Sequence, residues 1–452
     1  MKTVSFPHRS HVRTFRFLDF DFYESTAFLR YGVDDAVTFE ERIQFHDAPP
    51  PDAERMNVLT ACLRRLHLAA GVSYYKAYIP PEIRVEGHAL SRKEADFFNL
   101  FYRSGLGEFS FRNGVTPDIS FPFDEDVLPD PSGMRLPHRI IVPVGGGKDS
   151  IVTLEMLKKA GRSPVPFSVG LPRPIRETIE LSGLPSLRVT RTIAPGLMEL
   201  NRRADEFGAL NGHVPVTGII AFILAAASVL YGFSDVAMSN ERSANVGNTE
   251  KDGLTVNHQW SKSVEFERAF AGLMKDVLPN FRYFSLLRPL SELSIARMFS
   301  EIKKYDGVFT SCNRAFRLDE TKRLDRWCGE CDKCRFVFLA LAPFMGRDRI
   351  LSVFGRNPLN EAEQAEGFRR LLGLSSFKPF ECVGEIEESV LAFSLLAARP
   401  EWGEDAVIKM LDGDVATKYR ARLTEYSDRI FALSDDHCIP EEYADVIELF
   451  KR

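Results

Sequence analysis

The stretch that decides the fold runs Ile140-Ile141-Val142-Pro143-Val144-Gly145-Gly146-Gly147-Lys148-Asp149-Ser150. The β-branched residues before the glycines indicate a buried strand. The next residues, 151–160, place apolar side chains at 151, 154 and 157 on one helical face, and Gly161 can end that helix. Three glycines let backbone N–H groups approach an anion, and a helix start adds positive partial charge. The sequence therefore predicts a strand, a phosphate-binding glycine loop and a helix.

The spelling of this loop excludes two common phosphate motifs. A Walker loop needs Lys followed directly by Ser or Thr, whereas Lys148 is followed by Asp149. The dinucleotide pattern fails because no third glycine closes it. The loop resembles the S-G-G-x-D-S loop of the ATP-pyrophosphatase (PP-loop) superfamily, with Gly145 where that family usually has Ser. The plainer alternative is a glycine turn without a ligand.

The PP-loop resemblance implies ATP as a substrate, cleaved to AMP and pyrophosphate, with AMP placed on an acceptor oxygen. Asp149 then helps to position Mg²⁺ or the loop, and Lys148 adds positive charge. The residues implied to hold the pyrophosphate are Gly145, Gly146, Gly147, Lys148, Asp149 and Ser150.

Composition limits the remaining possibilities. The chain has 452 residues, 44% hydrophobic and 27% charged, which predicts a globular protein of two or three domains. A net charge of −5 without a long basic run argues against nucleic acid as a partner. Seven cysteines in so long a chain do not form a disulfide framework, and the first residues lack a signal-peptide core, so we expect a cytoplasmic protein. The uncharged segment 214–233 is expected to be a buried helix rather than a membrane span, since no second span accompanies it.

Three regions follow from the pattern along the chain. Residues 136–345 alternate strand and helix patterns, which predicts an α/β fold with a doubly wound parallel sheet of the PP-loop type. Residues 1–135 are predicted to form an accessory α+β domain, with helix starts capped by Asp52 and by a capping box at Ser91. Residues 346–452 read as a helical region.

A long polar segment, 239–263, follows a predicted strand ending near Met238. Ligands of open α/β sheets bind at the carboxyl ends of the strands, and long polar loops there are often functional. Glu241, His258 and Lys262 are its candidate functional residues, because each offers acid–base chemistry or charge. The alternative is a solvated surface loop.

A cysteine cluster closes the central region. Cys328, Cys331 and Cys334 have C-x2-C-x2-C spacing, and Cys312 lies a short loop upstream. Four thiolates suit a closed, structural Zn²⁺ site. An iron–sulfur cluster accepts the same ligands and is the second interpretation, and chance clustering of thiols is the third.

The glycine loop together with the cysteine cluster resembles the 7-cyano-7-deazaguanine synthases, but the loop 239–263 does not read like theirs. Chain length and this loop look more like the UDP-N-acetylmuramoyl-L-alanyl-L-glutamate epimerases, bacterial cell-wall enzymes that use ATP and Mg²⁺. The resemblance includes the segment 105–109 and rests most specifically on Asn240-Glu241 and 256–263.

This resemblance implies inversion of the terminal L-glutamate of UDP-N-acetylmuramoyl-L-alanyl-L-glutamate through an acyl-adenylate, for peptidoglycan synthesis. His258 is then the first acid–base candidate, Glu241 the second, and Lys262 steadies the developing enolate oxygen or the α-phosphate; Asp149 completes the predicted catalytic set. A cognate muramoyl ligase is an implied functional partner. Two alternatives stay open: a PP-loop enzyme that amidates or thiolates a nucleobase, as in 7-deazaguanine or tRNA modification, and a non-catalytic nucleotide sensor.

Overall fold

The computed structural model describes residues 5–127, 133–247, 249–251, 254–317, 320–375, 381 and 383–451. Its strands are β1 Thr14–Tyr23, β2 Thr26–Val33, β3 Val37–Phe45, β4 Glu82–Val85, β5 Ile140–Pro143, β6 Val165–Val169, β7 Leu187–Thr192, β8 Asp235–Met238, β9 Thr249–Lys251, β10 Leu254–Val256 and β11 Arg282–Ser285. A nine-stranded sheet has the order β11-β8-β5-β6-β7-β3-β2-β1-β4, and β10 pairs with β9 separately. The fold is therefore α/β.

The chain divides into two compact units whose segments alternate along the sequence. Unit 1 comprises Met1–Ile140, Leu187–Val236 and Thr249–Tyr283; unit 2 comprises Ile141–Ser186, Ala237–Asn248 and Phe284–Arg452.

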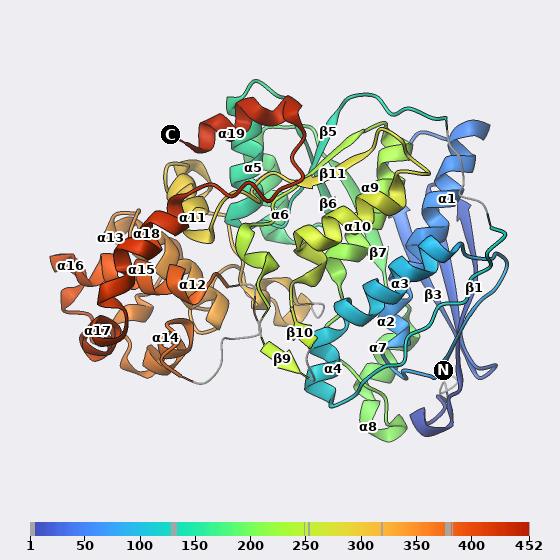
Figure 1. The fold of residues 1–452 in the computed structure, drawn as a ribbon, viewed down its shortest axis with the longest axis horizontal. Helices are drawn as coiled ribbons and strands as arrows, with labels where there is room; N and C mark the ends of the chain where they lie inside the picture. The colour runs from blue at the N-terminus through green and yellow to red at the C-terminus, as the bar shows by residue number, and fades with distance from the viewer. Residues whose placement is uncertain are drawn as a thin grey trace. The chain divides into compact units, whose positions relative to one another are not determined.

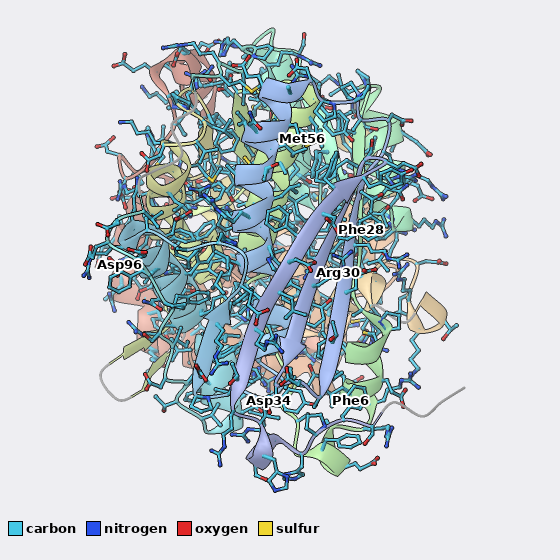
Figure 2. The ribbon with its side chains drawn as sticks, turned by 90° about the vertical axis from the view of Figure 1, so that its right-hand side faces the viewer. Phe6, Phe28, Arg30, Asp34, Met56 and Asp96 are labelled. Atoms are coloured by element: carbon cyan, nitrogen blue, oxygen red, sulfur yellow. The ribbon has the colours of Figure 1, made fainter. Side chains whose placement is uncertain are left out.

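Unit 1 is built on antiparallel strands. β1 pairs with β2, β2 with β3, and β3 with β7, all antiparallel, while β1 pairs with β4 in parallel. Figure 2 shows these strands beside α1 (Ala53–Ala70), with Phe28 and Arg30 on β2 and Met56 on α1. The other helices of the unit are α2 Val72–Tyr75, α3 Arg92–Gly105, α4 Gly107–Asn113, α7 Pro195–Arg202, α8 Ala204–Phe207, α9 Val216–Tyr231 and α10 Val264–Met274.

The core of unit 1 is aromatic, which explains the Tyr- and Phe-rich sequence before residue 125. Tyr31 and Tyr74 are fully buried and stack with ring centroids 4.6 Å apart. The Tyr74 hydroxyl donates to buried Glu41 at 2.9 Å, and Arg191 of β7 binds Glu41 of β3 at 2.7 Å. This satisfied polar group fixes the β3–β7 pairing, because a buried carboxylate needs its partners.

Unit 2 contains the glycine loop and the C-terminal helices. Its helices are α5 Lys148–Lys159, α6 Arg173–Ser182, α11 Glu292–Ser300, α12 Asp332–Leu341, α13 Arg347–Phe354, α14 Ala365–Leu371, α15 Ile386–Ala397, α16 Pro400–Gly403, α17 Ala406–Tyr419, α18 Leu423–Phe431 and α19 Ala444–Phe450. In Figure 1 the helices α12 to α18 form one orange-to-red group. The parallel pair β5–β6 precedes them in the chain.

Several local predictions are confirmed. Asp52 caps α1 and Ser91 forms a capping box with Glu94 at the start of α3. The apolar segment forms α9, in which every residue from Ala221 to Leu230 is buried. Within the described part of the chain, no helix combines the length and the apolarity needed to cross a bilayer. The helical C-terminal region is also confirmed.

The sheet differs from the prediction in one respect. The sequence pattern predicts a parallel sheet within residues 136–345 and a separate accessory α+β domain in residues 1–135. The structure joins β1–β3 to β7 antiparallel, so the sheet is mixed. The reason is that Arg42 pairs with Thr192, a contact between residues far apart in the chain that no local pattern encodes.

Candidate functional site

The glycine loop has the predicted strand–loop–helix form. Gly146 has φ +79°, a conformation that disfavours a side chain, and its carbonyl accepts from the Thr310 N–H at 2.9 Å. Gly147 caps α5, and a Cβ there would lie 2.6 Å from the Ser311 hydroxyl oxygen. The first N–H groups of α5 lack intrahelical acceptors and carry the positive end of the helix dipole. The loop can therefore hold a phosphate group through its backbone.

Lys148 forms ion pairs with two carboxylates of the protein. Its ammonium contacts the carboxylates of Glu292 and Asp149, and the Lys148 and Glu292 side chains are each 1% exposed. Burial lowers the pKa of Lys148, but the charges of Asp149 and Glu292 outweigh burial, so the net pKa is raised and the lysine stays protonated. Its charge is therefore balanced by protein carboxylates inside unit 2.

Glu241 follows β8 in the same unit and is 5% exposed. Its backbone carbonyl accepts from Arg288 Nη1 at 2.7 Å, and its Oε1 accepts from the Ser243 hydroxyl at 3.4 Å. The pKa of Glu292 is raised by burial, and the charges of Asp149 and Glu241 add to that rise. The structure thus brings Asp149 and Glu241 into one electrostatic group around the Lys148–Glu292 pair.

His258 and Lys262 lie in unit 1, on the segment between β10 and α10. Trp260 anchors this segment: it is 5% exposed, stacks edge-on against Phe266 at 5.4 Å, and donates from Nε1 to Glu265 at 2.7 Å. Lys262 Nζ donates to Gln259 Oε1 at 3.4 Å. The four predicted catalytic residues therefore divide between the units, His258 and Lys262 in one and Asp149 and Glu241 in the other.

Two partners of His258 are not in the predicted set. His258 Nδ1 forms a hydrogen bond with Glu108 Oε2, and His213 Nδ1 lies 3.6 Å from the same oxygen. These three residues gather their ligand atoms within 4.8 Å of one another. Glu108 stands inside the segment 105–109 that carried the family resemblance, but a single Glu among 63 acidic residues gives no spacing signal.

The four predicted cysteine ligands meet in unit 2. The sulfur atoms of Cys312, Cys328, Cys331 and Cys334 all lie within 4.8 Å of one another. Cys331 Sγ is 3.4 Å and Cys328 Sγ is 3.6 Å from Cys334 Sγ. Tetrahedral Zn²⁺ with bonds of about 2.3 Å separates its sulfurs by about 3.8 Å. The donor set and its spacing therefore fit a structural zinc ion.

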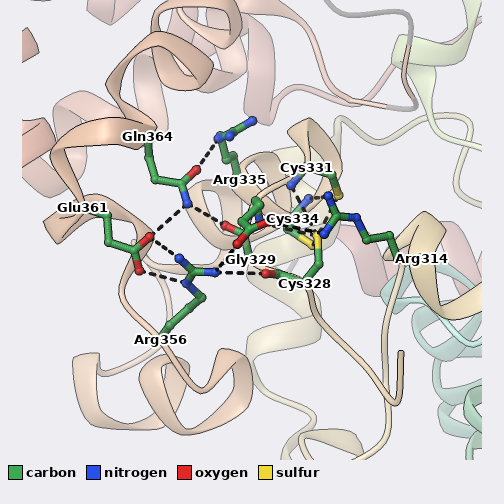
Figure 3. Close-up of polar contacts among 10 residues, drawn as sticks. Arg314, Cys328, Gly329, Cys331, Cys334, Arg335, Arg356, Glu361 and Gln364 are labelled. Carbon is green, nitrogen blue, oxygen red and sulfur yellow. Dashed lines mark hydrogen bonds and ion pairs between the residues drawn. The ribbon is translucent and has the colours of Figure 1, made fainter. Parts of the chain in front are cut away.

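Backbone and side-chain contacts hold the cysteine loop in shape (Figure 3). The N–H groups of Glu330 and Cys331 donate to Cys328 Sγ, each at 3.4 Å. Arg356 Nη1 donates to the Cys328 carbonyl at 3.1 Å, and Gln364 Nε2 donates to the Gly329 carbonyl at 3.1 Å. Such outer contacts orient metal ligands before the metal binds.

Comparison with known proteins gives matches along nearly the whole chain. Residues 7–286 match the MurL N-terminal domain, and residues 308–425 match the MurL C-terminal domain. A protein of Xanthomonas oryzae pv. oryzae (strain MAFF 311018) is 41% identical over 438 residues, 96% of each chain. A protein of Salinispora tropica is 43% identical over 458 residues, 97% of this chain and 96% of its own. A Micromonospora protein is 43% identical over 429 residues, 91% of this chain and 92% of its own.

These likenesses define the protein first as an enzyme, an isomerase of the epimerase class. All three relatives are named UDP-N-acetyl-alpha-D-muramoyl-L-alanyl-L-glutamate epimerase. The chain belongs to this epimerase family, and the family resemblance inferred from the sequence is confirmed.

Proposed function

We propose that this protein inverts the terminal L-glutamate of UDP-N-acetylmuramoyl-L-alanyl-L-glutamate to D-glutamate, with ATP cleaved to AMP and pyrophosphate. The observation that carries this proposal is the sequence similarity to three proteins named as this epimerase, which extends over at least 91% of the chain. The glycine loop supports the ATP-dependent part, since its geometry suits a phosphate held by backbone N–H groups.

Adenylation solves a chemical problem of this reaction. An α-carbon next to a carboxylate resists deprotonation, because the carbanion would add a second negative charge beside that of the carboxylate. The glutamate α-carboxylate attacks the α-phosphorus of ATP, pyrophosphate leaves, and the mixed anhydride carries no carboxylate charge. The α-proton is then acidic enough for a side-chain base. The preceding alanine carbonyl oxygen can also attack the acyl carbon and displace AMP, which gives an oxazolone with a still more acidic α-proton. After the proton is returned to the opposite face, water hydrolyses the acyl-adenylate or the oxazolone and restores the free carboxylate, so that AMP leaves by either route.

Under this proposal, each candidate residue has a role. Backbone N–H groups of Gly145 to Ser150 hold the leaving pyrophosphate in a PP-loop manner. Asp149 helps to position Mg²⁺ or the loop. Lys148 anchors the loop through its ion pair with Glu292 and adds positive charge near the phosphates. His258 exchanges the α-proton, Lys262 steadies the enolate oxygen, and Glu241 is the second acid–base candidate.

The cysteine cluster serves the fold under this proposal. Cys312, Cys328, Cys331 and Cys334 hold one Zn²⁺, which ties the segment around Cys312 to the start of α12. Four thiolates leave no position open for a substrate or water. A muramoyl ligase that attaches L-glutamate supplies the substrate.

The test is to incubate the protein with the UDP-linked dipeptide, Mg²⁺ and ATP in D₂O. We expect AMP, pyrophosphate, deuterium at the glutamate α-carbon, and D-glutamate after acid hydrolysis. Release of pyrophosphate while glutamate stays L and unlabelled would point instead to amidation or another ligation. Release of ADP and orthophosphate would overturn the adenylation step.

A further inference from the structure

Three ionisable side chains from separate parts of unit 1 meet around one carboxylate. Glu108 lies on α4, His213 precedes α9, and His258 follows β10. The Glu108 side chain is 6% exposed, that of His258 14% and that of His213 27%, so the group is shielded from water but reachable from it. Such partly buried acid–base clusters are typical of reaction sites.

Packing holds these parts in place. A Cβ at Gly105 would lie 2.6 Å from the Pro215 ring, so the end of α3 approaches the residue before α9 more closely than a side chain permits. Lys76 Nζ donates to Asn211 Oδ1 at 2.8 Å, and Asn113 Nδ2 donates to the Asn211 carbonyl at 3.4 Å. The segment that carries His213 is thus attached at several points, which gives the cluster a fixed geometry.

The hydrogen bonds define which atoms exchange protons. Glu108 Oε1 accepts from Arg112 Nε at 2.5 Å, and Glu108 Oε2 accepts from His258 Nδ1. Burial alone raises the pKa of Glu108, but His258, His213 and Arg112 outweigh it and lower the pKa, so Glu108 is an anion. An anionic acceptor assigns the proton of neutral His258 to Nδ1, and the basic lone pair to Nε2.

His213 has a different state. Its pKa is lowered to about 4, with burial as the largest cause; the charges of His258, Lys262 and Arg112 also lower the pKa, and the charge of Glu108 raises it. His213 is therefore neutral at neutral pH. The two rings have centroids only 4.5 Å apart, with both Nδ1 atoms toward Glu108. Bases that flank a carbon each need a nitrogen about 3 Å from it on opposite sides, so these two rings serve one face only.

We propose that Glu108 and His258 form an acid–base pair acting on one face of the glutamate α-carbon, with Glu108 as the positioning residue. This inference rests on the proposed epimerase function. His258 Nε2 takes the α-proton, the C–H electron pair stays on the substrate as the enolate, and the imidazolium is stabilised by the Glu108 carboxylate. A group outside the histidine pair serves the opposite face.

A metal ion bound to the same three groups fits less well. Nitrogen and oxygen ligands around one Zn²⁺ ion are separated by about 3 Å or more. His258 Nδ1 and Glu108 Oε2 are instead in direct hydrogen-bond contact. Arg112 binds the same carboxylate, and the charge of Lys262 acts on His213. Two cations beside the cluster disfavour a divalent ion there.

The experiment compares Glu108→Gln, Glu108→Asp and His258→Asn with the unaltered enzyme, using two separate readouts. Substrate-dependent ATP–pyrophosphate isotope exchange reports adenylation. Deuterium incorporation from D₂O, started from either the L-Glu or the D-Glu epimer of the UDP-linked dipeptide, reports proton transfer at each face. Glu125→Gln is the matched control, because Glu125 is exposed, lies in the same unit and pairs with Arg92.

We expect Glu108→Gln and His258→Asn to keep adenylation within about threefold and to lose deuterium exchange by about 100-fold or more from the same single epimer. Glu108→Asp should recover part of it, and Glu125→Gln should match the unaltered enzyme. Three results would refute the assignment of Glu108 and His258 as an acid–base pair on one face: deuterium exchange that is retained from both epimers, an equal loss of exchange from both epimers, or a parallel loss of adenylation. So would a bound metal, besides the cysteine-held ion, that disappears in Glu108→Gln. If the unaltered enzyme incorporates no deuterium with ATP, the proposed function itself fails.

Discussion

The Lys148–Glu292 ion pair offers the most demanding test of how the glycine loop is held. Both side chains are 1% exposed, so removal of either leaves a charge that water cannot solvate. Loss of one partner of a buried pair costs about 3–5 kcal/mol. The two losses should not be equal, because Lys148 has a second carboxylate in contact, Asp149, whereas Glu292 faces further negative charge from Asp149 and Glu241.

Lys148→Met should therefore lower the free energy of opening of α5 by about 4–5 kcal/mol, and Glu292→Gln should lower it by about 2–3 kcal/mol. The double variant should cost less than the sum by at least about 1.5 kcal/mol, since neither fully buried charge of the pair is then left behind and the Asp149 side chain is 26% exposed to water. Because the chain has two compact units, hydrogen exchange of the α5 amides is the suitable measurement.

Lys159→Met is the control for the pair, because Lys159 is an exposed lysine on the same helix. It should change the opening free energy by no more than about 0.5 kcal/mol. The reasoning is refuted if the two single variants cost the same small amount and the double variant is simply additive. That result would mean that water or neighbouring side chains solvate the remaining charge.

The other predictions concern the metal and pH. Cys331→Ser should lower bound zinc from about one per chain, measured by elemental analysis, and reduce the yield of folded protein; iron absorbance would refute zinc. Gly329→Ala should also lower zinc content, because Gly329 has φ +71° and its Cβ would lie 2.2 Å from Arg356 Cδ; Gly346→Ala, where a Cβ meets nothing within 4 Å, is the control. Burial lowers the pKa of His67 to about 4, so its neutral form stabilises unit 1 above pH 6.5, and about 3 kcal/mol is lost as the pH falls from 6.5 to 4. Urea unfolding of His67→Gln across this range should show a shallower loss, and an unchanged slope would contradict the assignment.

Local patterns accounted for the parts of the molecule that were predicted correctly. The strand, glycine loop and α5 are specified within one short stretch. The caps at Asp52 and Ser91 are also local, because each side chain accepts from the backbone N–H three residues further on. The predicted metal ligands Cys328, Cys331 and Cys334 also lie within seven consecutive residues, from the loop before α12 into its first turn. Each of these features is decided by neighbours in sequence, so spacing alone predicts it.

The pairing of the N-terminal strands with the central sheet was not predicted, for the opposite reason. β2 alternates half-buried and buried residues over its first six positions, and Arg30 there binds Asp19, Asp21 and Glu40 across neighbouring strands. A strand whose outer face is so charged gives a weak hydrophobic signal. Its place in the sheet depends on β3 pairing with β7, which begins only at Leu187. Pairings at such separation are set by tertiary packing and not by propensity.

Glu108, His213 and His258 also come from segments far apart in the sequence, so no local pattern predicts that they meet. Metal ligands can lie close together in sequence because a metal needs only converging sulfurs, but an acid–base pair must face a substrate carbon while its carboxylate stays shielded. Glu108 achieves this by lying on a short helix while its imidazole partners arrive from two other segments. The close approach of Gly105 to Pro215 and the hydrogen bond from Lys76 to Asn211 bring these segments together. Neither contact has a sequence pattern from which it could be predicted. His258 was predictable from its chemistry, whereas the carboxylate that orients it became visible only once the chain was folded.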